Sequence, residues 1–181
     1  MNKTKYLADA TAIITVSNPI FALIETVFAG MSDEVSIKSR FYATALNYLG
    51  MGWLYANGRA LSRKIFHVHD NSNEFVQGLH DILYGSAFAG AMSKILYPLA
   101  GEQDVKKAAF GITASMLCSP VIQYLTGYSI DAFEDMTGIK ACERSTYPEF
   151  VRRQSPTTKK YIAAVLSAAS VGAMAIIYNL Q

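Results

Sequence analysis

The stretch that decides the fold is residues 161–181, YIAAVLSAASVGAMAIIYNLQ, which contains no Asp, Glu, Lys or Arg. A helix needs about 20 apolar residues to cross the hydrocarbon core of a bilayer. A helix of a soluble bundle also needs a polar outer stripe, and the core of this stretch has no charged face. Residues 161–181 therefore predict a transmembrane helix.

Three further stretches, at residues 10–24, 41–58 and 108–130, are also free of charge, and a fourth apolar stretch contains only Asp81 and Lys94 as charged residues. Together they predict a polytopic membrane protein of the all-α class. The predicted spans are residues 7–30, 40–58, 79–101, 108–130 and 160–180.

The first apolar stretch is interpreted as a retained span rather than a signal peptide. Asp9, Asn18 and Glu25 interrupt its apolar pattern, and no clear small-residue cleavage site follows.

The composition of the whole chain excludes several other classes of protein. A hydrophobic content of 51% excludes intrinsic disorder, a net charge of +2 gives no case for nucleic-acid binding, and 2 Cys cannot form a disulfide framework.

The distribution of Lys and Arg predicts how the chain is oriented. Most of them lie at the N-terminus, between the second and third spans, and at residues 139–159. Because cytoplasmic loops are enriched in Lys and Arg, we expect a cytoplasmic N-terminus and, with five spans, an outer C-terminus in the cytoplasmic (inner) membrane. Cys142 and Cys118 then need no disulfide partner.

The chain is expected to form a four-helix core at residues 1–138, a basic cytoplasmic loop at 139–159 and an additional transmembrane helix at 160–181. Both outer loops begin with a glycine followed by acidic residues, which is typical of a tight helical hairpin. The core would contain two hairpins, at about 7–58 and 79–130, related by a parallel repeat. The matching features are Asp9 with Asp81, Gly30 with Gly101, and Tyr55-x-x-Gly58 with Tyr124-x-x-Gly127.

Ionisable and polar residues inside the spans are the candidate site, because each is costly in a bilayer. Asp9 and Asp81 are either N-terminal helix caps or proton-accepting carboxylates. Thr11, Asn18 and Glu25 recur every seven residues, so they share one helix face, where they form either interhelical contacts or a substrate pathway.

Lys94 lies at a depth close to that of Glu25, so it either pairs with Glu25 or extends its ammonium group to the interface.

Stripes of small residues favour close helix packing. One stripe is Gly111, Ser115 and Ser119. Another is Ala164, Ala168 and Gly172, which is expected either at a homo-oligomer contact or against the four-helix core.

No enzyme signature is present in the sequence. The nearby pair His67 and His69 is weak evidence for a metal, and there is no phosphate-binding glycine motif. We therefore expect no catalytic residue, no cofactor and no metal.

Several short motifs resemble the bacterial L-alanine exporter family. They begin with Ala8-Asp-Ala-Thr-Ala. They continue with Ile24-Glu25, Gly30-Met31-Ser32, Ser39-Arg40, Asn47, Tyr55, Arg59, Asp81-Ile-Leu, and Gly127-Tyr128 with Asp131. The resemblance covers about residues 6–138 and implies a small inner-membrane exporter of L-alanine that is driven by the proton gradient. The fifth span and Lys94 depart from the family pattern.

A transported amino acid is a zwitterion, which needs an anionic partner for its ammonium group and donors for its carboxylate. Glu25 or Asp9 are the candidates for the first role, and Arg40, Asn47 or Arg59 for the second. Protonation of Glu25 would couple export to proton entry. The alternative function is a non-transporting membrane protein that uses its last helix for assembly with a partner.

Overall fold

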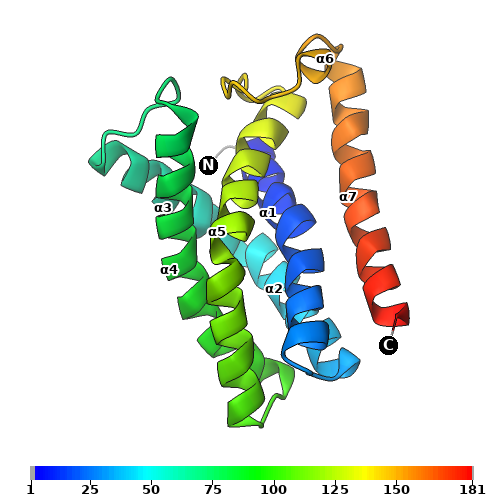
Figure 1. Ribbon diagram of the computed structural model, residues 1–181. Coiled ribbons are helices and arrows are strands. Elements are labelled where there is room, and N and C mark those ends of the chain that lie inside the picture. The colour runs from blue at the N-terminus through cyan, green and yellow to red at the C-terminus, as the bar shows by residue number, and fades with distance from the viewer. Residues whose placement is uncertain (1–2, 181) are drawn as a thin grey trace.

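A computed structural model describes residues 3–180, which form helices and connecting segments and contain no strand. The long helices run side by side, and α2 and α3 cross behind them (Figure 1). The all-α prediction is therefore confirmed. The elements are α1 (Lys3–Leu23), η1 (Ile24–Phe28), α2 (Asp33–Leu46), η2 (Asn47–Met51), α3 (Gly52–Ile65), α4 (Glu74–Ala100), α5 (Val105–Met136), α6 (Glu149–Arg152) and α7 (Pro156–Asn179).

Within residues 3–180, three helices are long and apolar enough to cross a membrane: α1 with its extension η1, α5 and α7. This finding supports a membrane protein, but the predicted count of five spans is not confirmed. The helix α4 has 27 residues, but Asp81 and Lys94 lower its apolar content. The helices α2 and α3 have only 14 residues each.

The span predicted at residues 40–58 is not confirmed, because the helical chain is kinked in the middle of it. The segment η2 is π-helical, and Gly50 within it has a φ of 135°. L-residues rarely adopt this backbone conformation, whereas glycine adopts it without a steric penalty. The glycine separates α2 from α3, which leave the break in different directions (Figure 1).

The two tight turns are as predicted. Gly30 and Gly101 have φ values of 62° and 92°, and each follows a helix that ends there. The side chain of Ser32 then caps α2, and that of Asp104 caps α5. The predicted repeat of two hairpins is nevertheless not confirmed, because the second helix of the first hairpin is broken and α5 is a continuous helix of 32 residues.

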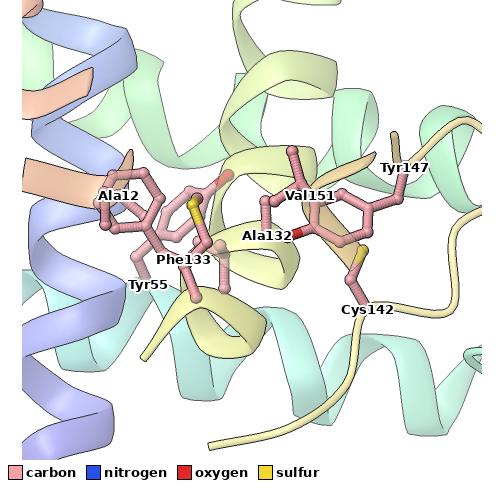
Figure 2. Close-up of a cluster of buried hydrophobic side chains, with 10 residues drawn as sticks. Ala12, Tyr55, Ala132, Phe133, Cys142, Tyr147 and Val151 are labelled. Atoms are coloured by element: carbon pink, nitrogen blue, oxygen red, sulfur yellow. The ribbon is translucent and has the colours of Figure 1, made fainter. Parts of the chain in front are cut away.

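The main apolar core joins the helices to the segment that follows α5. Figure 2 shows this cluster of buried side chains. It includes Ala12 of α1, Tyr55 of α3 and Phe133 of α5, together with Cys142 and Tyr147 from the connecting segment. The predicted basic loop at 139–159 is therefore partly a core element, and it also contains α6 and the first turn of α7.

The helix α7 packs on α1 and α5 through one narrow face. Ala163 on this face is buried, and the Ser167 hydroxyl lies 3.2 Å from the Thr15 hydroxyl. The predicted stripe of Ala164, Ala168 and Gly172 is exposed, so its proposed docking against the core is wrong. The start of α1 and the end of α7 lie at opposite ends of the bundle (Figure 1).

Substituting Gly50 with alanine should destabilise the fold by about 1–3 kcal/mol, because a Cβ is strained at this φ. The Cβ itself would meet nothing within 4 Å, so the effect would come from the backbone alone. Thermal unfolding in detergent, followed by circular dichroism, measures it.

Gly90 of α4 is the matched control, because a Cβ there also meets nothing within 4 Å and its φ is helical. Gly90→Ala should be neutral or slightly stabilising. Equal effects of the two substitutions would contradict the strain at Gly50.

Candidate functional site

Five charged side chains form a buried cluster at one end of the bundle. Arg59 donates from Nε and Nη2 to the two carboxylate oxygens of Asp81, at 2.8 and 2.9 Å. Arg63 and Arg144 also donate to Asp81, each with a contact of 2.9 Å. Asp131 accepts from Arg144 at 2.7 Å and from Arg59 at 3.1 Å. We call these five residues the arginine–aspartate cluster.

The cluster joins elements that are distant in the sequence. Arg59 and Arg63 lie one turn apart on α3, Asp81 lies on α4, Asp131 lies on α5, and Arg144 lies in the following segment. Asp81 has no exposed surface, so its charge depends mainly on these guanidinium groups, with the His80 Nδ1 atom 3.4 Å from Oδ1 as a further neighbour. Bidentate contacts between guanidinium and carboxylate are strong and directional, and they fix the relative positions of the helices.

Neither Asp9 nor Asp81 caps a helix, so that interpretation is wrong. The side chain of Asn73 caps α4, and Asp81 lies two turns further inside this helix. Asp9 is likewise inside α1, where it is buried and 2.8 Å from the Lys5 ammonium. Lys5 also contacts Glu134 of α5, so the two carboxylates share one lysine.

A second buried ion pair joins Glu25 to Arg40, not to Lys94. The Arg40 Nη2 atom donates to Glu25 Oε1 at 2.6 Å. The hydroxyls of Ser36 and Ser39 donate to the same carboxylate, at 2.7 and 3.1 Å. The predicted pair of Glu25 with Lys94 is wrong, because Lys94 is exposed on α4 and Glu25 has no exposed surface.

The polar stripe predicted on α1 faces the chain from α2 to η2. Glu25 contacts Arg40 at 2.6 Å, and the Asn18 Nδ2 atom donates to the Thr44 hydroxyl at 2.8 Å. The Thr11 hydroxyl lies 2.9 Å from that of Tyr48. The three residues of the stripe are seven positions apart in the sequence, and their partners on the antiparallel chain are four positions apart. The prediction that they share one face is confirmed.

A cavity of about 110 Å³ lies in the centre of the bundle, between α1, α2, α4 and α5. Its wall is mostly apolar and includes Phe88, Ala89 and Leu96 of α4. Two of its buried polar atoms have no hydrogen-bond partner among the described residues. They are the Nε atom of Arg40, a donor, and the Oδ1 atom of Asn18, an acceptor.

The structure divides the predicted site residues into four groups. Asn18, Arg40 and Asn47 line the cavity. Glu25 lies behind Arg40, and Asp9 pairs with Lys5, so neither carboxylate reaches the cavity wall. Arg59 and Asp81 belong to the arginine–aspartate cluster, and Lys94 points outward from α4.

Sequence reasoning missed Arg63 and Arg144. Arg63 lies four residues after Arg59, which is a signal for the same helix face. Arg144 lies in an irregular segment without a periodic pattern, so no signal was available for it.

The cluster and the cavity are connected, because Tyr55, one turn before Arg59, donates to Gln123 in the cavity wall at 3.1 Å.

The histidines do not form a metal centre within residues 3–180, where no group of three or more metal-ligating side chains occurs. Comparisons with protein-family models, with curated proteins and with solved structures find nothing that matches this chain.

Replacing Asp81 with asparagine should destabilise the fold by about 3–5 kcal/mol, because three buried guanidinium groups would lose their main acceptor. The midpoint of thermal unfolding in detergent measures this loss.

The control is Glu149→Gln. Glu149 pairs with Arg152 and Arg153 at the surface, away from the cluster, and its side chain is half exposed, so its removal should leave the midpoint of thermal unfolding nearly unchanged. Comparable losses for both variants would show that the cluster does not hold the helices together.

Proposed function

We propose that the chain is a secondary transporter that exports L-alanine, or a similar small neutral amino acid, across the cytoplasmic membrane by proton antiport. The observation that carries this proposal is the central cavity, with an unpartnered donor on Arg40 and an unpartnered acceptor on Asn18. A zwitterionic amino acid has one group for each of them. Its carboxylate would accept from Arg40, and its ammonium group would donate to Asn18.

The size of the cavity favours a small side chain. An apolar cavity of about 150 Å³ in an engineered protein takes up benzene, which has as many heavy atoms as L-alanine. The cavity here measures about 110 Å³, and Phe88 and Leu96 narrow it. An apolar wall would accept the methyl group of alanine, whereas a bulky side chain would require the helices to separate.

Glu25 is proposed as a positioning residue rather than as a direct ligand. It accepts from Arg40 Nη2 at 2.6 Å, while Nε of the same guanidinium remains free for a substrate. Two serine hydroxyls hold the carboxylate of Glu25 in place, so the direction of the guanidinium is fixed.

Asp9 is the carboxylate that we propose for proton transfer. Every carboxylate oxygen of Glu25 and of Asp81 accepts a hydrogen bond, whereas Asp9 Oδ1 is buried and has no partner within residues 3–180. An ionised oxygen without a donor is costly in the interior, so a proton would stabilise it. Glu134, which contacts the same lysine, adds a second negative charge nearby.

The runner-up is a non-transporting assembly protein of the membrane. The observation that favours it is the exposure of the helix α7. In the most apolar stretch of this helix, only 11% of the residues are buried. A helix that contacts the core so little has most of its surface available for a partner. Absence of amino-acid uptake by the purified chain, together with loss of a bound partner when α7 is deleted, would favour this function.

Filling the cavity should abolish transport without unfolding the protein. Ala89→Phe places a ring in the cavity, and uptake of labelled L-alanine by proteoliposomes with an imposed pH gradient should fall by at least about tenfold.

The control on the same helix is Lys94→Gln, which changes an exposed side chain and should leave uptake unchanged. Circular dichroism of each variant checks that the helices remain. Full uptake by a folded Ala89→Phe variant would exclude this cavity as the substrate site.

Asp9→Asn should leave alanine binding intact but remove the coupling of alanine transport to proton movement. Exchange of labelled for unlabelled alanine needs no net proton movement, so it should persist, whereas uptake driven by a pH gradient should be lost. Glu34→Gln is the control, because Glu34 is exposed at the start of α2 and contacts only Lys38. Gradient-driven uptake by Asp9→Asn at the original rate would contradict the coupling role.

A further inference from the structure

The segment after α5 lies across the end of the bundle and makes polar contacts with α4 and α5. Arg144 enters the arginine–aspartate cluster between α4 and α5, and its guanidinium lies over the rings of Tyr124 and Tyr128, at 5.9 and 5.3 Å. Next along the segment, the backbone nitrogen of Thr146 donates to Glu74 Oε2 at 3.3 Å. Both hydroxyls of Ser145 and Thr146 donate to the same carboxylate, at the start of α4.

We propose that residues 141–147 form a movable strap, with Arg144 as its latch, that opens and closes over the arginine–aspartate cluster. When it is closed, it covers the cluster and blocks this end of the bundle. When it is open, Arg144 leaves and exposes Asp81 and Asp131 to the surroundings. The strap is a conformational device of this chain, and it does not depend on which molecule the protein transports.

Charge balance within the cluster supports a latch that can leave. With Arg144 inserted, the cluster itself has three guanidinium groups and two carboxylates. A third carboxylate, that of Asp70, lies 3.8 Å from Arg63 Nη1, but Lys140 also pairs with it and balances its charge. The Nη1 atom of Arg144 and the Nε atom of Arg63 have no hydrogen-bond partner among the described residues. Without Arg144, Arg59 and Arg63 would balance Asp81 and Asp131. Burial of a surplus charge is costly, so withdrawal of this one arginine leaves a neutral, paired cluster.

The other contacts of the strap are a hinge, a tip and a backbone contact with α6, in which Arg152 Nη2 donates to the Arg144 carbonyl oxygen at 3.1 Å. Tyr147 is buried and donates to Asp135 at 2.8 Å, which anchors the end that leads into α6. Ser145 and Thr146 are exposed, and their hydrogen bonds to Glu74 are accessible to water. Exposed hydrogen bonds of this kind contribute little to stability, so the tip can detach while the anchor at Tyr147 remains.

A cysteine within the strap reports on its position. Cys142 is buried in the closed strap, next to Tyr147 in the core cluster of Figure 2. Burial raises the pKa of its thiol above the ordinary value. A buried thiol reacts slowly with a maleimide, and the rate rises with the fraction of time that the strap is open.

The test measures maleimide labelling of Cys142 in the full chain, in detergent and without denaturant. The other cysteine, Cys118 of α5, is first replaced by alanine. In this parent variant, we expect Cys142 to be labelled slowly, but faster than the protein unfolds globally. The rate of global unfolding is measured by the loss of the helical circular-dichroism signal. Labelling no faster than unfolding, or immediate labelling, would overturn the proposal.

Two variants should open the strap. Arg144→Gln removes the latch and should increase the labelling rate by about tenfold or more. Ser145→Asp leaves the buried cluster intact but places a carboxylate against Glu74, so it should act in the same direction. If Arg144→Gln does not fold, Ser145→Asp decides the question, and an unchanged rate in that variant would overturn the proposal.

Two controls should leave the rate near that of the parent. Ser145→Ala removes one exposed hydrogen bond without adding a charge. Arg153→Gln removes an exposed arginine that pairs with Glu149, outside the strap. A similar acceleration in either control would show general loosening and would also overturn the proposal. Because labelling requires no substrate, failure of the strap and failure of the transport function are distinguishable.

Discussion

The carboxylate of Asp81 is the interaction on which this end of the molecule depends. It is completely buried and accepts from Arg59, Arg63 and Arg144, which come from α3 and from the segment after α5. A buried carboxylate that loses such partners is strongly unfavourable, so the elements that carry them are held at one place. The broken chain of α2 and α3 can therefore cross the bundle without losing its position relative to α4 and α5.

Local patterns were sufficient to predict the all-helical class, the two glycine turns and the shared face of Thr11, Asn18 and Glu25. Each of these depends on spacing within one segment. The partner of Glu25 could not be predicted in the same way, because Arg40 and Lys94 both lie at suitable positions in the sequence. The choice depends on how α2 and α4 are placed around α1, and only the tertiary structure shows this.

The remaining differences from the sequence prediction have two physical causes. The first is the break at Gly50, where one glycine with a positive φ changes the direction of an apolar stretch that has no charge to mark it. The second is Arg144, which lies outside any periodic element. A basic residue between two spans is typical of a solvated loop. Here, long-range pairing with Asp81 and Asp131 overrides that tendency.

The surplus guanidinium of the cluster has an electrical consequence. Within its five ion-paired side chains, three positive charges face two negative ones, so the cluster carries a net positive charge. In a membrane, one elementary charge that crosses the whole field changes in energy by about 2.3 kcal/mol per 100 mV. Any movement of Arg144 along the bundle axis would therefore be sensitive to voltage, and the membrane potential would bias the position of the segment that carries it.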